Sequence, residues 1–395
     1  MEKHLQTGQK LKKMKIGILT QPLHNNYGGL LQNYALQTVL KRMGHEVWTI
    51  DRQFKETSLF RKFGSSIKRQ LLKPLIKNQP IRVWQTKKEK AIIAKNTAQF
   101  IKENIKTTHK ITSSAKMSNL SNYKFNAYIV GSDQVWRPEY SPCITNYFLD
   151  FVENEVNLKK IAYSASFGTD SWEFTPKEEA RCSELIKKFN AVSVREDSAI
   201  ELCKIHFNHT VIAQLDPTLL LCKCDYESLV HKAGVKESAG NMFVYFLDKD
   251  TFKNNVVETI TNKVGLTPFE VMPKKKFAEM KKKEIDLCIF PPVEQWLRAF
   301  MDAEFIVTDS FHGTVFSIIF EKPFIVIGNE ERGLARFDSL LKLFCLENRL
   351  VFQNNYKSIS SLIEKKNDYS SVTHILNNKR NEGLDFLKHN LSTNS

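Results

Sequence analysis

Short apolar runs alternate with helix-length amphipathic segments along most of this chain. At its start, KIGILT (15–20) and EVWTID (46–51) predict buried strands, and LLQNYALQTVLKRMG (30–44) predicts a helix between them that Gly44 ends. A strand–helix–strand unit favours parallel pairing of its two strands, because the helix provides the long crossover that a parallel pair requires. The fold class that this predicts is α/β, with doubly wound parallel sheets.

The alternation continues in two series of similar size, which predicts two Rossmann-like domains facing each other across an interdomain cleft. Further strands are expected at 125–131, 161–166, 191–196, 242–248, 287–290, 305–310 and 323–328. Further helices are expected at 87–105, 176–189, 251–263, 293–302, 313–321, 334–344 and 375–391. The expected division is a disordered leader (1–13), an N-terminal domain (14–190), a C-terminal domain (191–355) and helices that pack back on the N-terminal domain (356–395).

The formal net charge of +15 favours acidic partners such as phosphorylated substrates or anionic membranes. A basic insertion (57–88) carries nine Lys or Arg and no Asp or Glu. Within it, segment 60–78 mixes apolar and basic residues, a pattern suited to an anionic membrane surface. The alternative is a solvated helix packed on its own domain. Since no recognised motif accompanies the charge, no nucleic acid is expected.

The sequence has no apolar run long enough to span a bilayer, and its first residues do not resemble a signal peptide. Its seven cysteines are odd in number and mostly far apart, which predicts reduced thiols in a cytoplasmic protein. Cys222 and Cys224 form a C-x-C pair, but no second pair completes a metal site. We therefore expect no metal and no cofactor.

Ligands of open α/β sheets bind at the carboxyl ends of the strands, so the loops that follow strands are the candidate site. In NNYGG (25–29), paired glycines allow close backbone approach, and the next helix offers its N-terminus to an anion; a simple tight turn is the alternative. In GSDQVW (131–136), Ser132 and Asp133 either face a ligand or cap a helix.

Two later loops place ionisable groups at strand ends. In SVRE (193–196), Arg195 is suited to clamp a phosphate or carboxylate, unless it pairs with Glu196 or Asp197. In TDSFHGTVFSIIF (308–320), His312 opens a helix at the end of a buried strand. Because histidine exchanges protons near neutral pH, this position favours a catalytic role over a structural one.

Five segments in the same order resemble the polysaccharide pyruvyl transferase family: ILTQPLHNNYGGLLQNYAL (18–36), GSDQVW (131–136), SVRE (193–196), LDPTLLL (215–221) and TDSFHGTVFS (308–317). The resemblance implies a GT-B-like fold. It also implies transfer of pyruvate from phosphoenolpyruvate to a sugar of a surface polysaccharide or of its lipid-linked precursor, usually as a cyclic ketal. The family's essential histidine corresponds to His312, and its donor-binding arginine corresponds to Arg195.

The sequence departs from the family at one point, because many members have an arginine where this chain has Ser310. Arg332 or Arg336 is expected to supply the missing charge. The expected catalytic residues are His312, which protonates the donor methylene, and Asp133, which accepts a hydroxyl proton. The expected donor-binding residues are Arg195, Ser310, Gly313, Arg332 and Arg336. The expected acceptor or cleft-loop residues are Asn26, Tyr27, Gly28, Gly29 and Gln32.

Two other functions stay open at this stage. One is a sugar-nucleotide glycosyltransferase of the same fold, although no acidic ribose ligand is evident at the strand ends of the second domain. The other is a non-catalytic relative that binds sugar or membrane. A cytoplasmic location is expected, with peripheral attachment to the inner face of the membrane through 60–78 as an open alternative.

Overall fold

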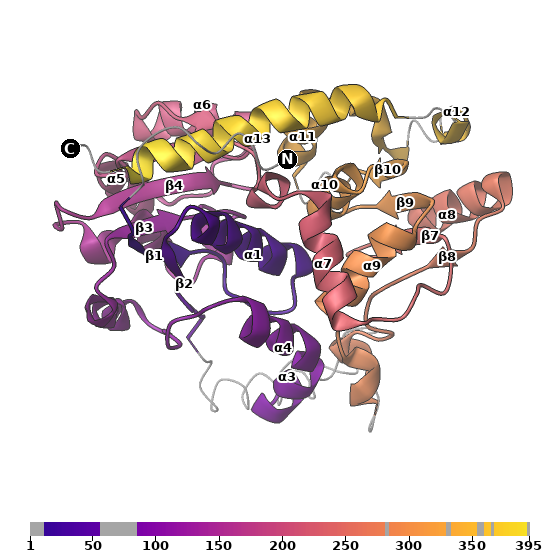
Figure 1. The fold of residues 1–395 in the computed structure, drawn as a ribbon, viewed down its shortest axis with the longest axis horizontal. Coiled ribbons are helices and arrows are strands. Elements are labelled where there is room, and N and C mark those ends of the chain that lie inside the picture. Colours follow the sequence, from indigo (N-terminus) through magenta and orange to yellow (C-terminus); the bar gives the residue numbers. More distant parts are fainter. Residues whose placement is uncertain are drawn as a thin grey trace, which may run out of the picture.

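The computed structural model describes residues 12–55, 85–280, 284–328, 333–353, 359–364 and 367–392. Most of the predicted leader, the basic segment 60–78 and Arg332 lie outside the described residues. The described strands form two separate sheets, which lie on opposite sides of the molecule in Figure 1. Among the described residues, no helix has both the length and the apolar character needed to cross a bilayer.

The first sheet has six strands in the order β2-β1-β3-β4-β5-β6, and all neighbouring pairs are parallel. Its strands are β1 (Lys15–Leu19), β2 (Glu46–Thr49), β3 (Ala127–Val130), β4 (Lys159–Ala165), β5 (Ala191–Val194) and β6 (Ile212–Ala213). The second sheet has five parallel strands in the order β11-β10-β9-β7-β8. These are β7 (Met242–Tyr245), β8 (Pro268–Phe269), β9 (Phe305–Thr308), β10 (Phe324–Ile327) and β11 (Leu350–Val351). Two Rossmann-like halves, as in the GT-B fold, are thus confirmed.

Helices connect the strands of both sheets. The α-helices are α1 (Tyr27–Arg42), α3 (Lys87–Ile93), α4 (Lys95–Asn104), α5 (Pro176–Ile186), α6 (Asp197–Phe207), α7 (Lys223–Ala233), α8 (Thr251–Val264), α9 (Val293–Asp302), α10 (Phe311–Ile319), α11 (Ala335–Leu343), α12 (Ile359–Glu364) and α13 (Tyr369–Leu391). Short 3-10 turns include η5 (Pro217–Leu220) and η7 (Ile285–Cys288). One continuous apolar core joins α1 of the first half to α9 and α10 of the second.

Each sheet has one point at which the chain reverses the direction of strand addition. In the first sheet this point lies between β1 and β3, and in the second it lies between β7 and β9. Ligands of doubly wound sheets bind at such switch points. The loops that follow the two strands run in opposite directions there, which leaves a crevice between them. The loops after β1, β3, β7 and β9 are therefore the segments that this fold places at a site.

Local sequence explains where the two helices at these points begin. Asn26 caps α1, since its Oδ1 accepts the backbone N–H of Gly29 at 3.2 Å. The predicted glycine loop is thus the first turn of α1. Ser310 caps α10 in the same way, and every residue of α10 from Phe311 to Ile319 is buried. A helix that is buried on all sides lies between layers, and α10 contacts both halves of the molecule.

Two expectations about the fold are wrong. The boundary at residue 191 falls inside the first sheet, because β5 and β6 pair with β4 and with each other. The expected strand 287–290 is largely the turn η7. Its neighbouring backbone groups bond elsewhere: Phe290 N–H donates to Ile93 O of α3 at 3.1 Å, and Leu287 O accepts from Lys275 N–H at 3.0 Å. An apolar run this short takes its structure from such tertiary contacts.

The last helix, α13, packs against the first half and runs along one side of both halves in Figure 1. Arg380 Nε donates to Leu219 O at 2.9 Å, and its Nη2 donates to Leu221 O at 3.1 Å. Gly383 passes so close to β4 that a Cβ there would lie 2.7 Å from the Tyr163 hydroxyl oxygen. The shorter helix α12 packs on α8 of the second half instead.

Candidate functional site

A cleft of about 620 Å³ lies where the two switch points meet. The loops after β1 and β3 contribute His24, Asn25, Asn26, Asp133 and Gln134. The loops after β7 and β9 contribute Leu247, Asp309, Ser310, Phe311 and His312. The cleft is therefore built by both halves, as the position of the switch points requires.

His312 lies in the first turn of α10, and its ring is buried against Gly28 of α1. A Cβ at residue 28 would come within 2.2 Å of the His312 Cγ and Nδ1, which is far inside contact distance. Gly313 has a comparable role beneath the helix, since a Cβ there would lie 2.2 Å from Thr308 Oγ1. Both glycines thus make room for the close approach of α10.

The partner of His312 is Asp216, at the start of η5. The His312 Nε2 lies 3.6 Å from Asp216 Oδ2, and both side chains are buried. Sequence analysis gave Asp216 no role, although it lies in the family segment 215–221. The available signal was an acidic residue followed by Pro217 and Thr218, directly after an apolar strand pattern. A carboxylate at this distance orients an imidazole.

The other oxygen of Asp216 is held by its own turn. Asp216 Oδ1 accepts from Thr218 N–H at 3.0 Å and from Thr218 Oγ1 at 2.7 Å. Burial by itself would raise the pKa of Asp216, but His312, Arg195 and Thr218 together hold that pKa well below its ordinary value. Asp216 is therefore ionised at neutral pH and fixed in place.

Arg195 follows β5 and is enclosed by carboxylates. Its Nη1 donates to Asp216 Oδ2 at 2.9 Å, its Nη2 lies 3.5 Å from Asp133 Oδ1, and its Nε lies 3.8 Å from Glu196 Oε2. Burial alone would lower the pKa of Arg195, but these three carboxylates raise it. Arg195 lines a neighbouring cavity of about 430 Å³, which shares Phe311 and Arg336 with the cleft. Its contact with His312 runs through Asp216.

The other predicted catalytic and donor residues take different positions. Asp133 lines the cleft and pairs with Arg195. Ser310 also lines the cleft, but its Oγ accepts the Gly313 N–H at 3.4 Å, so the two residues expected to bind the donor also bond to each other. Arg336 lies at the cleft, where desolvation and repulsion from Arg195 lower its pKa to about 10, and it keeps its charge at neutral pH.

The residues of the predicted cleft loop divide between the cleft and the interior. Asn26 and Gly29 line cavities at the first switch point. Tyr27 lines the cleft but anchors the two halves: it stacks on Trp296 at 5.6 Å, and its hydroxyl donates to Pro291 O at 2.9 Å. Gln32 is buried, and its Oε1 accepts from Ser132 N–H at 3.1 Å. A buried polar side chain of this kind holds backbone rather than substrate.

The cleft residues that were not expected from the sequence include His24, Arg137 and Tyr140. Arg137 donates to both carboxylate oxygens of Glu173, at 2.9 and 2.8 Å, and lies 4.4 Å from the Tyr140 ring. A smaller cavity of about 340 Å³ adjoins the cleft and shares His24 and Tyr140 with it. Their signal was proximity to the motifs, since His24 precedes NNYGG and Arg137 follows GSDQVW.

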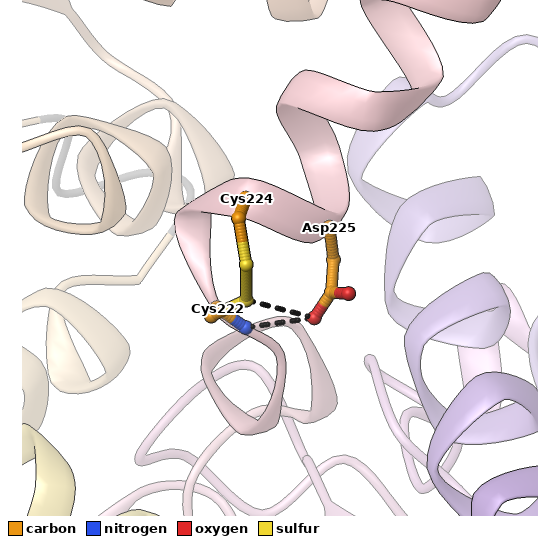
Figure 2. Close-up of side chains that lie close together, drawn as sticks. All are labelled: Cys222, Cys224 and Asp225. Carbon is orange, nitrogen blue, oxygen red and sulfur yellow. Dashed lines mark hydrogen bonds between the residues drawn. A yellow bond between two sulfur atoms is a disulfide. The ribbon is translucent and has the colours of Figure 1, made fainter. Parts of the chain in front are cut away.

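The expectation of reduced cysteines is wrong at one place. Cys222 and Cys224 form a disulfide at the start of α7 (Figure 2). Together with Asp225 they are the group of possible metal ligands found among the described residues. Cys203, which precedes this pair in sequence, is a buried free thiol. The disulfide lies six residues after Asp216 and outside the cleft.

Comparison with known proteins gives one match of sequence and several of structure. The family model for polysaccharide pyruvyl transferase matches residues 26–331. No curated protein sequence matches significantly. Among solved structures, the UDP-GlcNAc 2-epimerase from Methanocaldococcus jannaschii is 12% identical, with a TM-score of 0.47 over 90% of this chain and 93% of that one. The same enzyme from Neisseria meningitidis is 10% identical, with a TM-score of 0.47 over 92% and 99%.

Proposed function

Since this chain belongs to the polysaccharide pyruvyl transferase family, we propose that it moves a pyruvyl group from phosphoenolpyruvate to a sugar of a surface glycan or its lipid-linked precursor. The observation that carries this proposal is that His312 lines the cleft and lies 3.6 Å from the buried Asp216. A histidine held in place beside a cleft can act as the general acid that an enol donor requires.

His312 donates a proton to the methylene carbon of the donor, which makes the neighbouring carbon electrophilic. Asp216 fixes the orientation of the imidazole ring. A sugar hydroxyl then adds to the electrophilic carbon and loses its proton, with Asp133 as the acceptor of that proton. Phosphate leaves, and a second hydroxyl of the same sugar closes the ketal while its proton departs with the phosphate.

The positive charge for the donor comes from Arg336, which lines the cleft. Its guanidinium group is suited to bind phosphate or carboxylate in a fork geometry, and it takes the place of the family arginine that Ser310 replaces. Arg137 also lines the cleft, but it is bound to both carboxylate oxygens of Glu173. Arg195 has a different role in this proposal, because its carboxylate partners let it hold Asp216 and Asp133 in position.

The acceptor sugar binds in the smaller cavity at the first switch point. Phe54 and Tyr140 line it, and both rings are unusually exposed for their size, at 51% and 42%. Exposed aromatic faces beside a polar cleft suit the apolar face of a sugar ring. Asp133 and Asn26 line the same cavity and supply polar partners for the hydroxyl groups.

We also place the protein in the cytoplasm, where the donor and lipid-linked precursors meet.

Two measurements test the proposal. Phosphoenolpyruvate should raise the thermal unfolding midpoint of the chain, and nucleotide sugars should leave it unchanged. The lipid-linked glycans of cells that lack the protein should lose the mass of one pyruvyl group, and the wild-type gene should restore it. Unchanged glycan masses, or stabilisation by nucleotide sugars in place of phosphoenolpyruvate, would refute the proposal.

A further inference from the structure

The Cys222–Cys224 disulfide lies at the first turn of α7, outside the cleft and its chemistry. Figure 2 shows both sulfur atoms and the Asp225 carboxylate gathered on one side of this turn. The Cys222 N–H donates to Asp225 Oδ2 at 3.0 Å, and Cys222 Sγ lies 3.2 Å from the same oxygen. Cys224 is exposed, whereas Cys222 is half-buried.

This disulfide does little to stabilise the fold. A disulfide stabilises mainly by restricting the unfolded chain, and the effect grows with the number of residues in the closed loop. Here the bonded cysteines are only two positions apart. The chain also has large apolar cores on both sides of its sheets, so it does not need a covalent link. An exposed disulfide that contributes little stability is chemically labile.

The surroundings of this disulfide favour attack by a thiol on Cys224, with Cys222 as the leaving group. Cys222 is the N-cap residue of α7, and the N-terminus of a helix is a position that stabilises a thiolate. Arg42 of α1 balances the charge of Asp225, because its Nη1 and Nη2 donate to the two carboxylate oxygens at 3.1 and 2.5 Å. Cys222 is thus the better leaving group, and the exposed Cys224 is the sulfur that an incoming thiol reaches.

We propose that Cys222 and Cys224 are a reversible thiol–disulfide exchange site that reacts with low-molecular-weight thiols. A thiolate attacks Cys224 Sγ, the Sγ–Sγ bond breaks, and Cys222 leaves as a thiolate that takes up a proton. A second thiol attacks the mixed disulfide and releases Cys224 as a thiol. Two external thiols are oxidised to one disulfide, and the protein disulfide is reduced to two thiols. Once reduced, Cys222 has a proton to donate to Asp225. The proposal does not depend on the transferase activity.

A metal site is the competing use of the same residues. The sulfur atoms of Cys222 and Cys224 and an Asp225 oxygen lie within 4.8 Å of one another, close enough to chelate one ion. Against this, Arg42 occupies both carboxylate oxygens of Asp225. A bound cation would lie beside that guanidinium and would be repelled by it. The charge arrangement therefore favours the redox pair.

The full-length protein tests the proposal in buffers of graded reduced and oxidised glutathione. After an acid quench, alkylation under denaturing conditions and mass spectrometry report the state of each cysteine. Cys222 and Cys224 should lose the label together as the oxidised fraction rises, while the buried Cys182 and Cys203 keep it. Label on both sulfurs at every ratio would overturn the proposal. So would a reduced chain that binds one added zinc ion through both sulfurs and thereby resists oxidation.

Single variants test the direction of the exchange. Cys222→Ser removes the sulfur that resolves a mixed disulfide, so a glutathione adduct should accumulate on Cys224 to most of the chain. In the wild type this adduct should stay at a few per cent. The exposed single thiol of Cys345 provides the internal control, because it should form the adduct in both proteins. An adduct on Cys345 without one on Cys224 in the variant would contradict the mechanism.

Discussion

Gly28 and His312, from opposite halves of the molecule, are in such close contact that a single added carbon at residue 28 would overlap the imidazole ring. The first turn of α1 therefore forms one wall of the histidine's pocket. This explains why NNYGG carries a glycine at that position although the backbone there has an ordinary helical conformation. The site depends on how closely the two halves approach, because neither half holds the ring alone.

Gly28→Ala should reduce the turnover of phosphoenolpyruvate on the order of 100-fold while the chain stays folded, because the His312 ring must move. Lys41→Ala, at the exposed end of the same helix and outside the cleft lining, is the control. Its activity should stay within a few-fold. Phosphate release and circular dichroism measure the two effects. Equal losses in both variants would argue against the contact with His312.

His312→Ala should lower phosphate release on the order of 100-fold or more in the presence of the acceptor, since general acid catalysis is lost. The unfolding midpoint should change far less than the rate. His389→Ala, in the last turn of α13 and distant in sequence from all cleft loops, is the control and should retain full activity. Near-normal release from His312→Ala would assign the proton transfer to another group.

Asp216→Asn should destabilise the chain by roughly 3–5 kcal/mol at neutral pH, because it leaves Arg195 with one buried charge partner fewer. The folded-state pKa of Asp216 is lowered, so its contribution exists above the unfolded pKa of about 4 and is lost as pH falls below that value. The difference between the wild type and Asp216→Asn should therefore shrink in acid. Denaturant midpoints at a series of pH values measure it, with the exposed Asp385→Asn as the control. A difference independent of pH would exclude this linkage.

Arg195→Met should cost a similar amount of stability, because three carboxylates lose their common cation. If Arg195 holds Asp216 rather than the donor, the double variant Arg195→Met/Asp216→Asn should be clearly more stable than the sum of the single losses predicts. Chemical denaturation of the four proteins completes the cycle. Strict additivity would show that the two residues act independently.

Tyr27→Phe should lower stability by about 1 kcal/mol, since it removes the hydrogen bond to Pro291 O but keeps the stacking on Trp296. Burial raises the pKa of Tyr27 far above its usual range, so this hydroxyl retains its proton across the accessible pH range. Tyr140→Phe, at an exposed ring, is the control and should be neutral for stability. A loss confined to Tyr140→Phe would contradict the anchoring role of Tyr27.

The order of elements is predictable from the sequence because the buried parallel strands are compact apolar runs separated by amphipathic segments of helix length. β1, β7, β9 and β10 lie within a few residues of their predicted positions. The wrong prediction of a strand at 287–290 has a physical cause. Four apolar residues before two prolines are compatible with either a strand or a buried turn. The contacts with α3 and with the loop at Lys275 determine that this segment forms a turn. The domain boundary failed because strand pairing is a tertiary property.

The site is less predictable, since its residues act in pairs that come from distant segments. The sequence predicts a proton-transfer role for His312, but nothing in the residues around position 216 indicates that Asp216 lies beside it. The role of Arg195 is equally hard to predict from the sequence. A guanidinium at a strand end suits an anionic substrate or three carboxylates equally well, and the choice depends on which acidic side chains the fold delivers. Gln32, on the buried side of α1, is a further example, because its role depends on the backbone of Ser132 from a distant segment.

The position of α13 predicts how truncations late in the gene affect the protein. Its Arg380 holds the carbonyl groups of Leu219 and Leu221, which border the turn that starts at Asp216. A premature stop codon between β11 and Arg380 would leave every residue that lines the cleft intact and remove this support. Truncations of the gene at these positions should consequently behave as null alleles.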